Sequence, residues 1–270
     1  MKVLFVGGGN MANALIGGLT RRGWSGADCT VVEIDEGARR RLFDAFGVRA
    51  LERLPATLDD QAAVVLAVKP QQLRPVAQVL APMIAGRPVI SIAAGIRTSD
   101  LSRWLGGHVR TVRVMPNTPA LVLAGVTGLY AMPGATGDDR DLAESILSAV
   151  GTTLWVEREE LLDSVTAVSG SGPAYVFYFI EALAQAAEDL GLTHAQARLL
   201  ATETFHGSAV LARQSEEEAG VLRARVTSKG GTTERALRTL DAEEVRRRVI
   251  EAVKQAAVRS RELGDELGRD

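Results

Sequence analysis

Residues 7–12 read Gly-Gly-Gly-Asn-Met-Ala and match the pattern Gly-x-Gly-x-x-Ala. In such a run Gly7 permits a tight turn, Gly9 lets the backbone approach a diphosphate, and Ala12 lets a helix pack closely on a strand. The amide groups that open the helix then face the anion. A glycine-rich turn without a ligand is the alternative. We therefore predict a dinucleotide site whose binding residues include Gly7, Gly9, Asn10 and Met11.

Charged residues of both signs follow the second expected strand. A carboxylate of Glu33 or Asp35 would accept hydrogen bonds from the adenosine ribose, which favours NAD. Arg39 and Arg40 could instead bind a 2′-phosphate, which favours NADP. A third interpretation is that these are solvated charges at a helix start. Both NADPH and NADH therefore stay open as cofactors.

A second glycine-rich and hydroxyl-rich run, residues 227–233, reads Thr-Ser-Lys-Gly-Gly-Thr-Thr. It leads into a helix that we expect to begin near Thr232. Backbone amides and hydroxyls at the positive end of a helix suit a carboxylate. A hydroxyl-capped helix start without a ligand is the alternative.

The histidines and the cysteine do not have the spacing of a metal site. The three histidines are scattered, and the single cysteine, Cys29, lies beside an apolar strand. We expect Cys29 to be a buried thiol and expect no bound metal.

The elements that must position these residues alternate along the first half of the chain. Short β-branched runs are separated by stretches of helical length, which predicts a mostly parallel sheet with its strands buried on both faces. We expect strands at residues 3–6, 30–34, 64–68, 89–92, 110–114, 126–132 and 152–156. We expect helices at residues 11–22, 36–46, 138–150, 174–190, 194–213 and 242–267.

The strand pattern stops near residue 160, and only helical patterns follow. The predicted fold class is α/β, with a Rossmann-type, mostly parallel sheet domain over residues 1–160 and a smaller all-α dimerisation domain over residues 161–270. The last helix has an apolar stripe through Val245, Val249 and Val253, and residues 175–180 are apolar on every side. Such surfaces need a partner, so we expect a homodimer through the helical domain, with an assembly of dimers as a further possibility.

Charge and hydropathy exclude several classes of protein. The formal net charge is −2, and acidic residues flank the arginine clusters, which argues against nucleic-acid binding. The longest purely apolar run, residues 62–68, is too short to cross a membrane. We expect a cytoplasmic protein without a nucleic-acid or membrane partner.

Six segments, two of which contain the glycine-rich runs above, resemble in their order along the chain the pyrroline-5-carboxylate reductases, which make proline from a cyclic imine with NAD(P)H. These segments are residues 6–11, 67–70, 91–95, 113–120, 168–175 and 226–233. The resemblance implies an oxidoreductase that reduces 1-pyrroline-5-carboxylate to L-proline by hydride transfer from NAD(P)H, the last step of proline biosynthesis. Another small cyclic imine or a keto acid as substrate, and a dinucleotide sensor without turnover, are the alternatives.

The resemblance also implies roles for particular residues. Small side chains after two strands would let the cofactor lie against the backbone, Lys69 could neutralise a phosphate, and Asn117 could bind the nicotinamide carboxamide. The further cofactor-binding residues are thus Ala67, Val68, Lys69, Pro70, Ala93, Ala94, Gly95 and Asn117. The serines of residues 169–172 do not have the spacing of a nucleophile elbow, and we expect this segment to cap the long helix that follows.

By the same resemblance, the loop before the Thr232 helix holds the substrate carboxylate, and the Thr233 hydroxyl lies near the ring nitrogen as the catalytic group. The substrate-binding residues are Ser228, Gly230, Gly231, Thr232 and Thr233. Lys229 stands where the family more often has proline, which bears on the rigidity of this loop.

Overall fold

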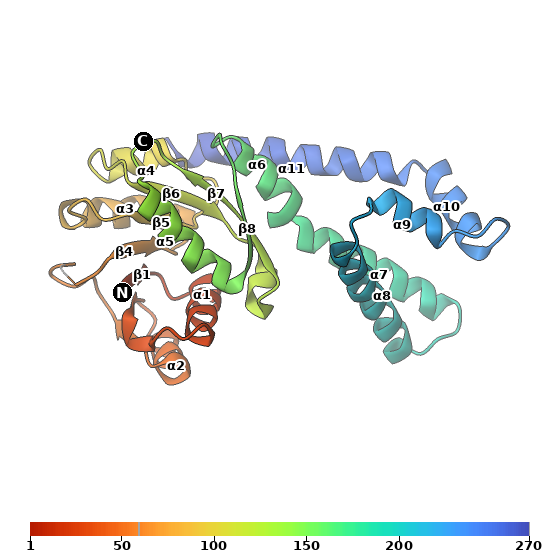
Figure 1. Ribbon diagram of the computed structural model, residues 1–270, viewed down its shortest axis with the longest axis horizontal. Helices are drawn as coiled ribbons and strands as arrows, with labels where there is room; N and C mark the ends of the chain where they lie inside the picture. The colour runs from red at the N-terminus through yellow and green to blue at the C-terminus, as the bar shows by residue number, and fades with distance from the viewer. Residues whose placement is uncertain (59, 270) are drawn as a thin grey trace. The chain divides into compact units, whose positions relative to one another are not determined.

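A computed structural model of the chain describes residues 1–58 and 60–269. Within these residues one sheet has the strand order β3-β2-β1-β4-β5-β6-β7-β8 (Figure 1). All neighbouring strands run parallel except β6 and β7, which are antiparallel. The strands are β1 (Val3–Val6), β2 (Cys29–Val32), β3 (Arg49–Leu51), β4 (Ala63–Leu66), β5 (Val89–Ser91), β6 (Thr111–Met115), β7 (Gly125–Ala131) and β8 (Gly151–Trp155).

The central strands are buried on both faces because helices cover both sides of the sheet. Val3 and Phe5 of β1 belong to one apolar cluster, and Leu4 and Val6 belong to another. Successive side chains of a strand point to opposite faces, so each face has a core of its own. The covering helices are α1 (Asn10–Arg21), α2 (Glu36–Phe46), α3 (Pro70–Leu80), α4 (Thr98–Trp104) and α5 (Gly137–Leu147).

Strand order changes direction at β1. The chain continues from β1 to β2 and β3 on one side, and from β4 to β6 on the other. In open α/β sheets the crevice at such a switch point, beyond the carboxyl ends of the strands, is where ligands bind. The expected fold class and all seven expected strands are confirmed. The sequence analysis did not predict β3, a short strand at the edge of the sheet.

The chain forms two compact units, one of residues 1–170 and 256–270 and the other of residues 171–255. The second unit is helical and contains α7 (Gly172–Asp189), α8 (His194–Gln214), α9 (Ala219–Arg225), α10 (Thr232–Ala242) and the first part of α11 (Val245–Leu267). In it α7 and α8 pack side by side. The compact units differ from the expected domain ranges, since residues 161–170 and 256–270 belong to the sheet-containing unit. The ranges 1–160 and 161–270 stay a prediction for the functional domains.

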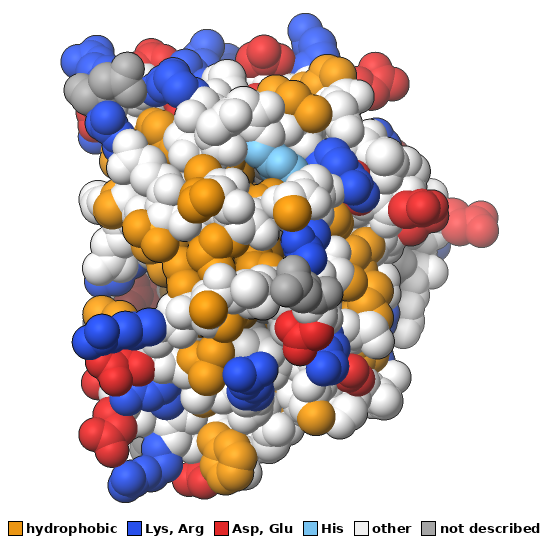
Figure 2. Space-filling model, turned by 90° about the vertical axis from the view of Figure 1, so that its left-hand side faces the viewer, with side chains coloured by type: hydrophobic (Ala, Val, Ile, Leu, Met, Phe, Trp, Pro, Cys, Tyr) orange, Lys and Arg blue, Asp and Glu red, His pale blue; other side chains and the backbone are white. Residues whose placement is uncertain are grey.

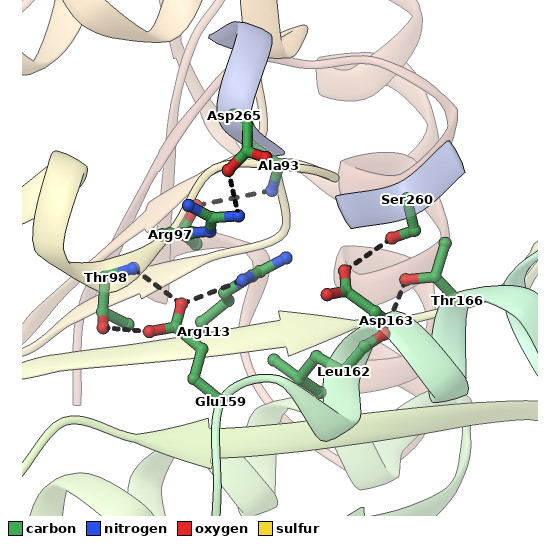
Figure 3. A network of polar contacts seen from close by, with 11 residues as sticks. Ala93, Arg97, Thr98, Arg113, Glu159, Leu162, Asp163, Thr166, Ser260 and Asp265 are labelled. Carbon is green, nitrogen blue, oxygen red and sulfur yellow. Dashed lines mark hydrogen bonds and ion pairs between the residues drawn. The ribbon is translucent and has the colours of Figure 1, made fainter. Parts of the chain in front are cut away.

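Polar contacts hold the end of α11 in the sheet-containing unit (Figure 3). Ser260 donates to Asp163 of the short helix α6 (Leu161–Val165) at 2.7 Å, and Arg97 pairs with Asp265 at 2.6 Å. Nearby, Glu159 accepts hydrogen bonds from the Thr98 N–H and hydroxyl. These contacts explain why the last residues of the chain belong to this unit although α11 begins in the other one.

The helix expected over residues 242–267 begins at Val245 instead, after a backbone break at Glu244, whose φ is +54°. A left-handed residue interrupts helical hydrogen bonding, so α10 and α11 are separate helices. None of the helices in the described ranges has the length and apolarity needed to cross a membrane.

Candidate functional site

The glycine loop, residues 7–9, lies at the switch point of the sheet. Gly7 has φ +105°, and its N–H donates to the Val32 carbonyl at 2.8 Å. A Cβ on Gly7 would lie 2.6 Å from the Ala67 carbonyl oxygen, whereas a Cβ on Gly9 would meet no atom within 4 Å. Gly7 therefore allows the tight turn that a residue with a side chain could not make. Gly9 leaves free space in front of α1.

The start of α1 offers its amides to a ligand. Gly9 is the N-cap residue, and no side chain caps the helix. The first N–H groups of a helix have no partner within the helix, and their positive end attracts an anion. These free amides face a space that any side chain at position 9 would narrow. The arrangement suits the binding of a diphosphate.

A cavity of about 550 Å³ lies beside this loop at the carboxyl ends of β1, β2 and β4. Five of the predicted cofactor-binding residues line it, namely Gly7, Gly9, Ala67, Val68 and Lys69. The sequence analysis missed Leu54, Gln71 and Gln72, which line it as well. The two glutamines could have been noticed, because they follow Pro70, the first residue of α3, shortly after β4 ends at Leu66.

Glu33, directly after β2, also lines this cavity. One carboxylate oxygen accepts a hydrogen bond from the Gly8 N–H at 2.8 Å, and the other accepts one from the Asp35 N–H at 2.9 Å. Asp35 caps α2 by accepting a hydrogen bond from the Ala38 N–H. The two acidic residues therefore differ in role, since one faces the cavity and the other supports a helix.

The remaining predicted cofactor residues are not in the lining of this cavity. Pro70 begins α3, while Asn10 and Met11 begin α1. Ala93 is buried and Ala94 is exposed, in the loop after β5. Gly95 has φ +76°, and a Cβ on it would lie 3.1 Å from the Leu267 side chain. The structure thus gives Gly95 a packing reason to be glycine.

Asn117 has internal partners for its side-chain amide. Its oxygen accepts a hydrogen bond from the Val126 N–H at 2.9 Å, and its NH2 group donates to the Ser169 carbonyl at 3.1 Å. The side chain is buried and ties the end of β6 to β7 and to residue 169. Contact with a nicotinamide therefore stays a prediction for this residue, whereas its role in holding the fold is observed.

Residues 169–172 lead into α7 as expected, with Ser171 as its N-cap residue, but without a side-chain capping bond. Residues 166–170 form a π-helical turn between α6 and α7, and Ser171, at the start of α7, makes no side-chain capping bond. The Ser169 hydroxyl donates to the Val165 carbonyl at 2.9 Å. The serines thus continue a helical path into α7. The expected position of the cap is confirmed, and Ser171 itself has helical backbone angles rather than the extended conformation usual at an N-cap.

The five predicted substrate residues lie together in the helical unit, three of them in the loop between α9 and α10 and Thr232 and Thr233 in the first turn of α10. As predicted, α10 begins at Thr232, and its N-cap, Gly231, provides no side-chain cap. Gly230 has φ +75°, and its N–H donates to Glu234. Thr233 is half-buried, and its hydroxyl has no hydrogen-bond partner in the part of the chain described. A hydroxyl beside an uncapped helix start can act on a small anionic ligand.

The helical unit also has an apolar groove of about 440 Å³ between α7 and α11. Tyr175, Tyr178 and Phe179 line it from α7, and Val249 and Val253 line it from α11. Aromatic side chains on α7 are exposed, with 68% of Tyr178 accessible. This is the apolar surface for which the sequence predicts a partner.

Figure 2 shows one face of the molecule, on which both basic and acidic side chains lie around apolar ones. The expected absence of a nucleic-acid partner stays a prediction. Among residues 1–58 and 60–269, no group of three His, Cys, Asp or Glu side chains could hold a metal ion.

Two family models match the chain. Residues 159–263 match a model described as pyrroline-5-carboxylate reductase dimerisation, and residues 2–95 match one described as NADP oxidoreductase, coenzyme F420-dependent. The pyrroline-5-carboxylate reductase of Pseudomonas aeruginosa is 41% identical over 99% of this chain and 98% of that protein. The Arabidopsis thaliana reductase is 37% identical over 97% of this chain and 95% of that protein.

Solved structures agree with these relatives. The pyrroline-5-carboxylate reductase of Coxiella burnetii has a TM-score of 0.92 at 40% identity, covering 97% of this chain and 98% of that one. The pyrroline carboxylate reductase of Plasmodium falciparum, solved with NADP bound, has a TM-score of 0.85 at 26% identity, covering 98% of each chain.

Proposed function

The chain belongs to the pyrroline-5-carboxylate reductase family, and on that premise we propose how its residues divide the reduction of 1-pyrroline-5-carboxylate to L-proline. The enzyme is an NAD(P)H-dependent oxidoreductase of proline biosynthesis. Its glycine loop and the cavity beside it hold the cofactor, and the loop before α10 holds the substrate. The observation that carries the first assignment is the free space at Gly9 in front of uncapped amides.

In this proposal the amides at the start of α1 bind the cofactor diphosphate, and Lys69 neutralises part of its charge. The small side chains of Ala67 and Val68 let the cofactor lie along the end of β4. When bound, the reduced nicotinamide supplies the hydride that adds to C5 of the imine.

The substrate carboxylate binds the backbone amides and hydroxyls of Ser228, Gly230, Gly231 and Thr232. A carboxylate is favoured there by the uncapped, positive start of α10. The hydroxyl of Thr233 then donates a hydrogen bond to the ring nitrogen or relays a proton from water. An imine protonated on nitrogen is already electrophilic, so orientation matters more than a strong acid.

The role of Thr233 is tested by Thr233→Ala and Thr233→Ser. We expect Thr233→Ala to lower kcat about a hundredfold, the low end of what a positioned proton donor contributes, with an unchanged Kd for reduced cofactor. Thr233→Ser keeps the hydroxyl and should recover most of the activity. Equal kcat values for Thr233→Ala and the unmodified enzyme would remove Thr233 from the mechanism.

The substrate is tested by initial rates on 1-pyrroline-5-carboxylate, piperideine-6-carboxylate and a 2-keto acid, each with NADH and with NADPH. We expect the five-membered imine to be reduced fastest. Consumption of reduced cofactor with the keto acid alone would contradict the proposed substrate. Tight cofactor binding without turnover on any of the three would favour a sensor.

The helical unit supports the formation of homo-oligomers, in agreement with the dimerisation model that matches residues 159–263. The specific contact we propose is a second copy on the groove lined by Tyr175, Tyr178 and Val249, with further association of dimers possible. We place the enzyme in the cytoplasm. Light scattering at micromolar concentration should give at least twice the chain mass of 28.7 kDa, and a monomeric mass would exclude the contact.

A further inference from the structure

The carboxylate of Glu33 is fixed in place by the backbone around it. Both of its oxygens accept backbone hydrogen bonds, from Gly8 at 2.8 Å and from Asp35 at 2.9 Å. A Cβ added to Gly8 would lie 3.1 Å from the Glu33 Cβ, so the side chain also packs tightly against the loop. The two bonds prevent the side chain from turning away.

Glu33 and Gly9 line the same cavity. If the diphosphate lies at Gly9, the adenosine ribose lies at the end of β2, because this is how the dinucleotide extends across a Rossmann sheet. The exposed Ile34 and the half-buried Leu54 line the cavity beside Glu33 and offer apolar surface for an adenine. The fixed carboxylate therefore stands where the two cofactors differ, at the ribose 2′ position.

The arginines that could bind a 2′-phosphate already have partners. One guanidinium nitrogen of Arg39 donates to the Glu33 and Ile34 carbonyls, each at 2.8 Å. Arg40 pairs with Glu36 at 3.3 Å, and Arg41 pairs with Asp35 at 3.9 Å. Lys69 is the cation in the cavity lining, and it follows β4 rather than β2. The described residues thus include a ready acceptor for ribose hydroxyls and no unpaired arginine of this cluster.

We propose that Glu33 makes this reductase prefer NADH over NADPH, by accepting hydrogen bonds from the ribose hydroxyls and repelling a 2′-phosphate. The proposal rests on the proposed function of the cavity as the cofactor site. It sets the chain apart from the Plasmodium falciparum relative, which was solved with NADP bound. To accommodate NADPH, Glu33 would have to give up its hydrogen bonds or face the like charge of the 2′-phosphate. The carboxylate therefore weakens the binding of NADPH more than it strengthens the binding of NADH.

The test is a fluorescence titration of the full-length enzyme with NADH and with NADPH, without substrate. We expect the Kd for NADH to be lower by at least about tenfold, which corresponds to about 1.4 kcal/mol. Glu33→Gln keeps the shape and removes the charge, and should bring the two Kd values to within about threefold of each other. Asp44→Asn, an exposed change in α2 outside the cavity lining, is the matched control and should keep the ratio of the unmodified enzyme.

Two further measurements keep the outcome decisive if Glu33→Gln disturbs the loop. The unmodified enzyme should bind adenosine 5′-diphosphate more tightly than its 2′-phosphorylated form. Lys69→Met should weaken NADH and NADPH alike; a loss confined to NADPH would assign the 2′-phosphate to Lys69 and overturn the proposal. Equal or tighter binding of NADPH by the unmodified enzyme would overturn it as well. Binding of neither cofactor would instead count against the proposed function.

Discussion

Two glycines of the nucleotide loop have opposite surroundings, which makes a paired substitution informative. At Gly7 the backbone has φ +105°, and an added Cβ would lie 2.6 Å from the Ala67 carbonyl oxygen. At Gly9 φ is −70°, and an added Cβ would meet nothing within 4 Å. Gly7→Ala should therefore damage the fold, whereas Gly9→Ala should leave the fold intact and obstruct the ligand.

The magnitudes follow from these contacts. For Gly7→Ala, a non-glycine residue in this region of φ costs about 1–3 kcal/mol, and displacing a backbone carbonyl adds about 1–3 kcal/mol. For Gly9→Ala, alanine is a poorer N-cap residue than glycine, which lowers the stability by a few tenths to about 1 kcal/mol. Alanine also restricts the unfolded chain, which raises the stability by about 0.4–1 kcal/mol. We expect the free energy of unfolding to fall by about 4 kcal/mol for Gly7→Ala, the middle of the summed range, and to stay within about 0.5 kcal/mol for Gly9→Ala.

Gly9→Ala should weaken cofactor binding although it leaves the stability of the fold nearly unchanged. A methyl group in front of α1 separates the amides from the diphosphate, and losing one hydrogen bond to a charged group costs about 1.5–3 kcal/mol. The Kd should rise about tenfold to a hundredfold, and the larger Gly9→Val should abolish binding.

The assay separates the two effects. All three tryptophans, Trp24, Trp104 and Trp155, lie in residues 1–170, so their fluorescence during urea unfolding reports on the sheet-containing unit. Titration with NADH and NADPH reports the affinity. Gly137→Ala is the control, since it also lies at a helix start with no atom within 4 Å of the added Cβ, but outside the cavity lining. Unchanged affinity in Gly9→Ala, or unchanged stability in Gly7→Ala, would refute this assignment of the loop.

Two more predictions concern groups away from the cavity. Burial raises the pKa of Asp139, but hydrogen bonds from Arg110 and from the Thr136 N–H outweigh burial and hold this pKa below its ordinary value. A depressed carboxyl pKa stabilises the fold above the ordinary value and loses this effect as pH falls through the folded-state pKa. Asp139→Asn should lower the free energy of unfolding by about 2 kcal/mol at pH 7, since one partner is buried and the other is partly exposed, and urea curves should converge with those of the unmodified enzyme below about pH 4. Burial, with a smaller contribution from Asp28, raises the pKa of the Cys29 thiol to about 11, so iodoacetamide at pH 8 should label it only in urea; rapid labelling of the folded enzyme would contradict its burial.

Features formed by neighbouring residues could be predicted from the sequence. The strand, turn and helix around Gly7 and Gly9 are continuous in the chain, and so is the loop that leads into α10 at Thr232. Glycine, β-branched and helix-forming residues impose their preferences over a few positions. For that reason the expected strands and the helices α1, α2 and α5 matched the structure closely. The sequence analysis did not predict the covering helices α3 and α4, and the short edge strand β3 had too few residues to give a signal.

Contacts between distant residues needed the tertiary structure. Glu33 and Gly8 are 25 positions apart, Asn117 and Ser169 are 52 apart, and Ser260 and Asp163 are 97 apart. Residue types alone marked Glu33 as a cofactor candidate without choosing the cofactor, and marked Asn117 as a cofactor-binding residue without revealing that its amide also bonds to β7 and to residue 169. The physical reason is that a polar side chain binds whichever donors and acceptors the strand order places beside it, and strand order depends on packing across the whole chain.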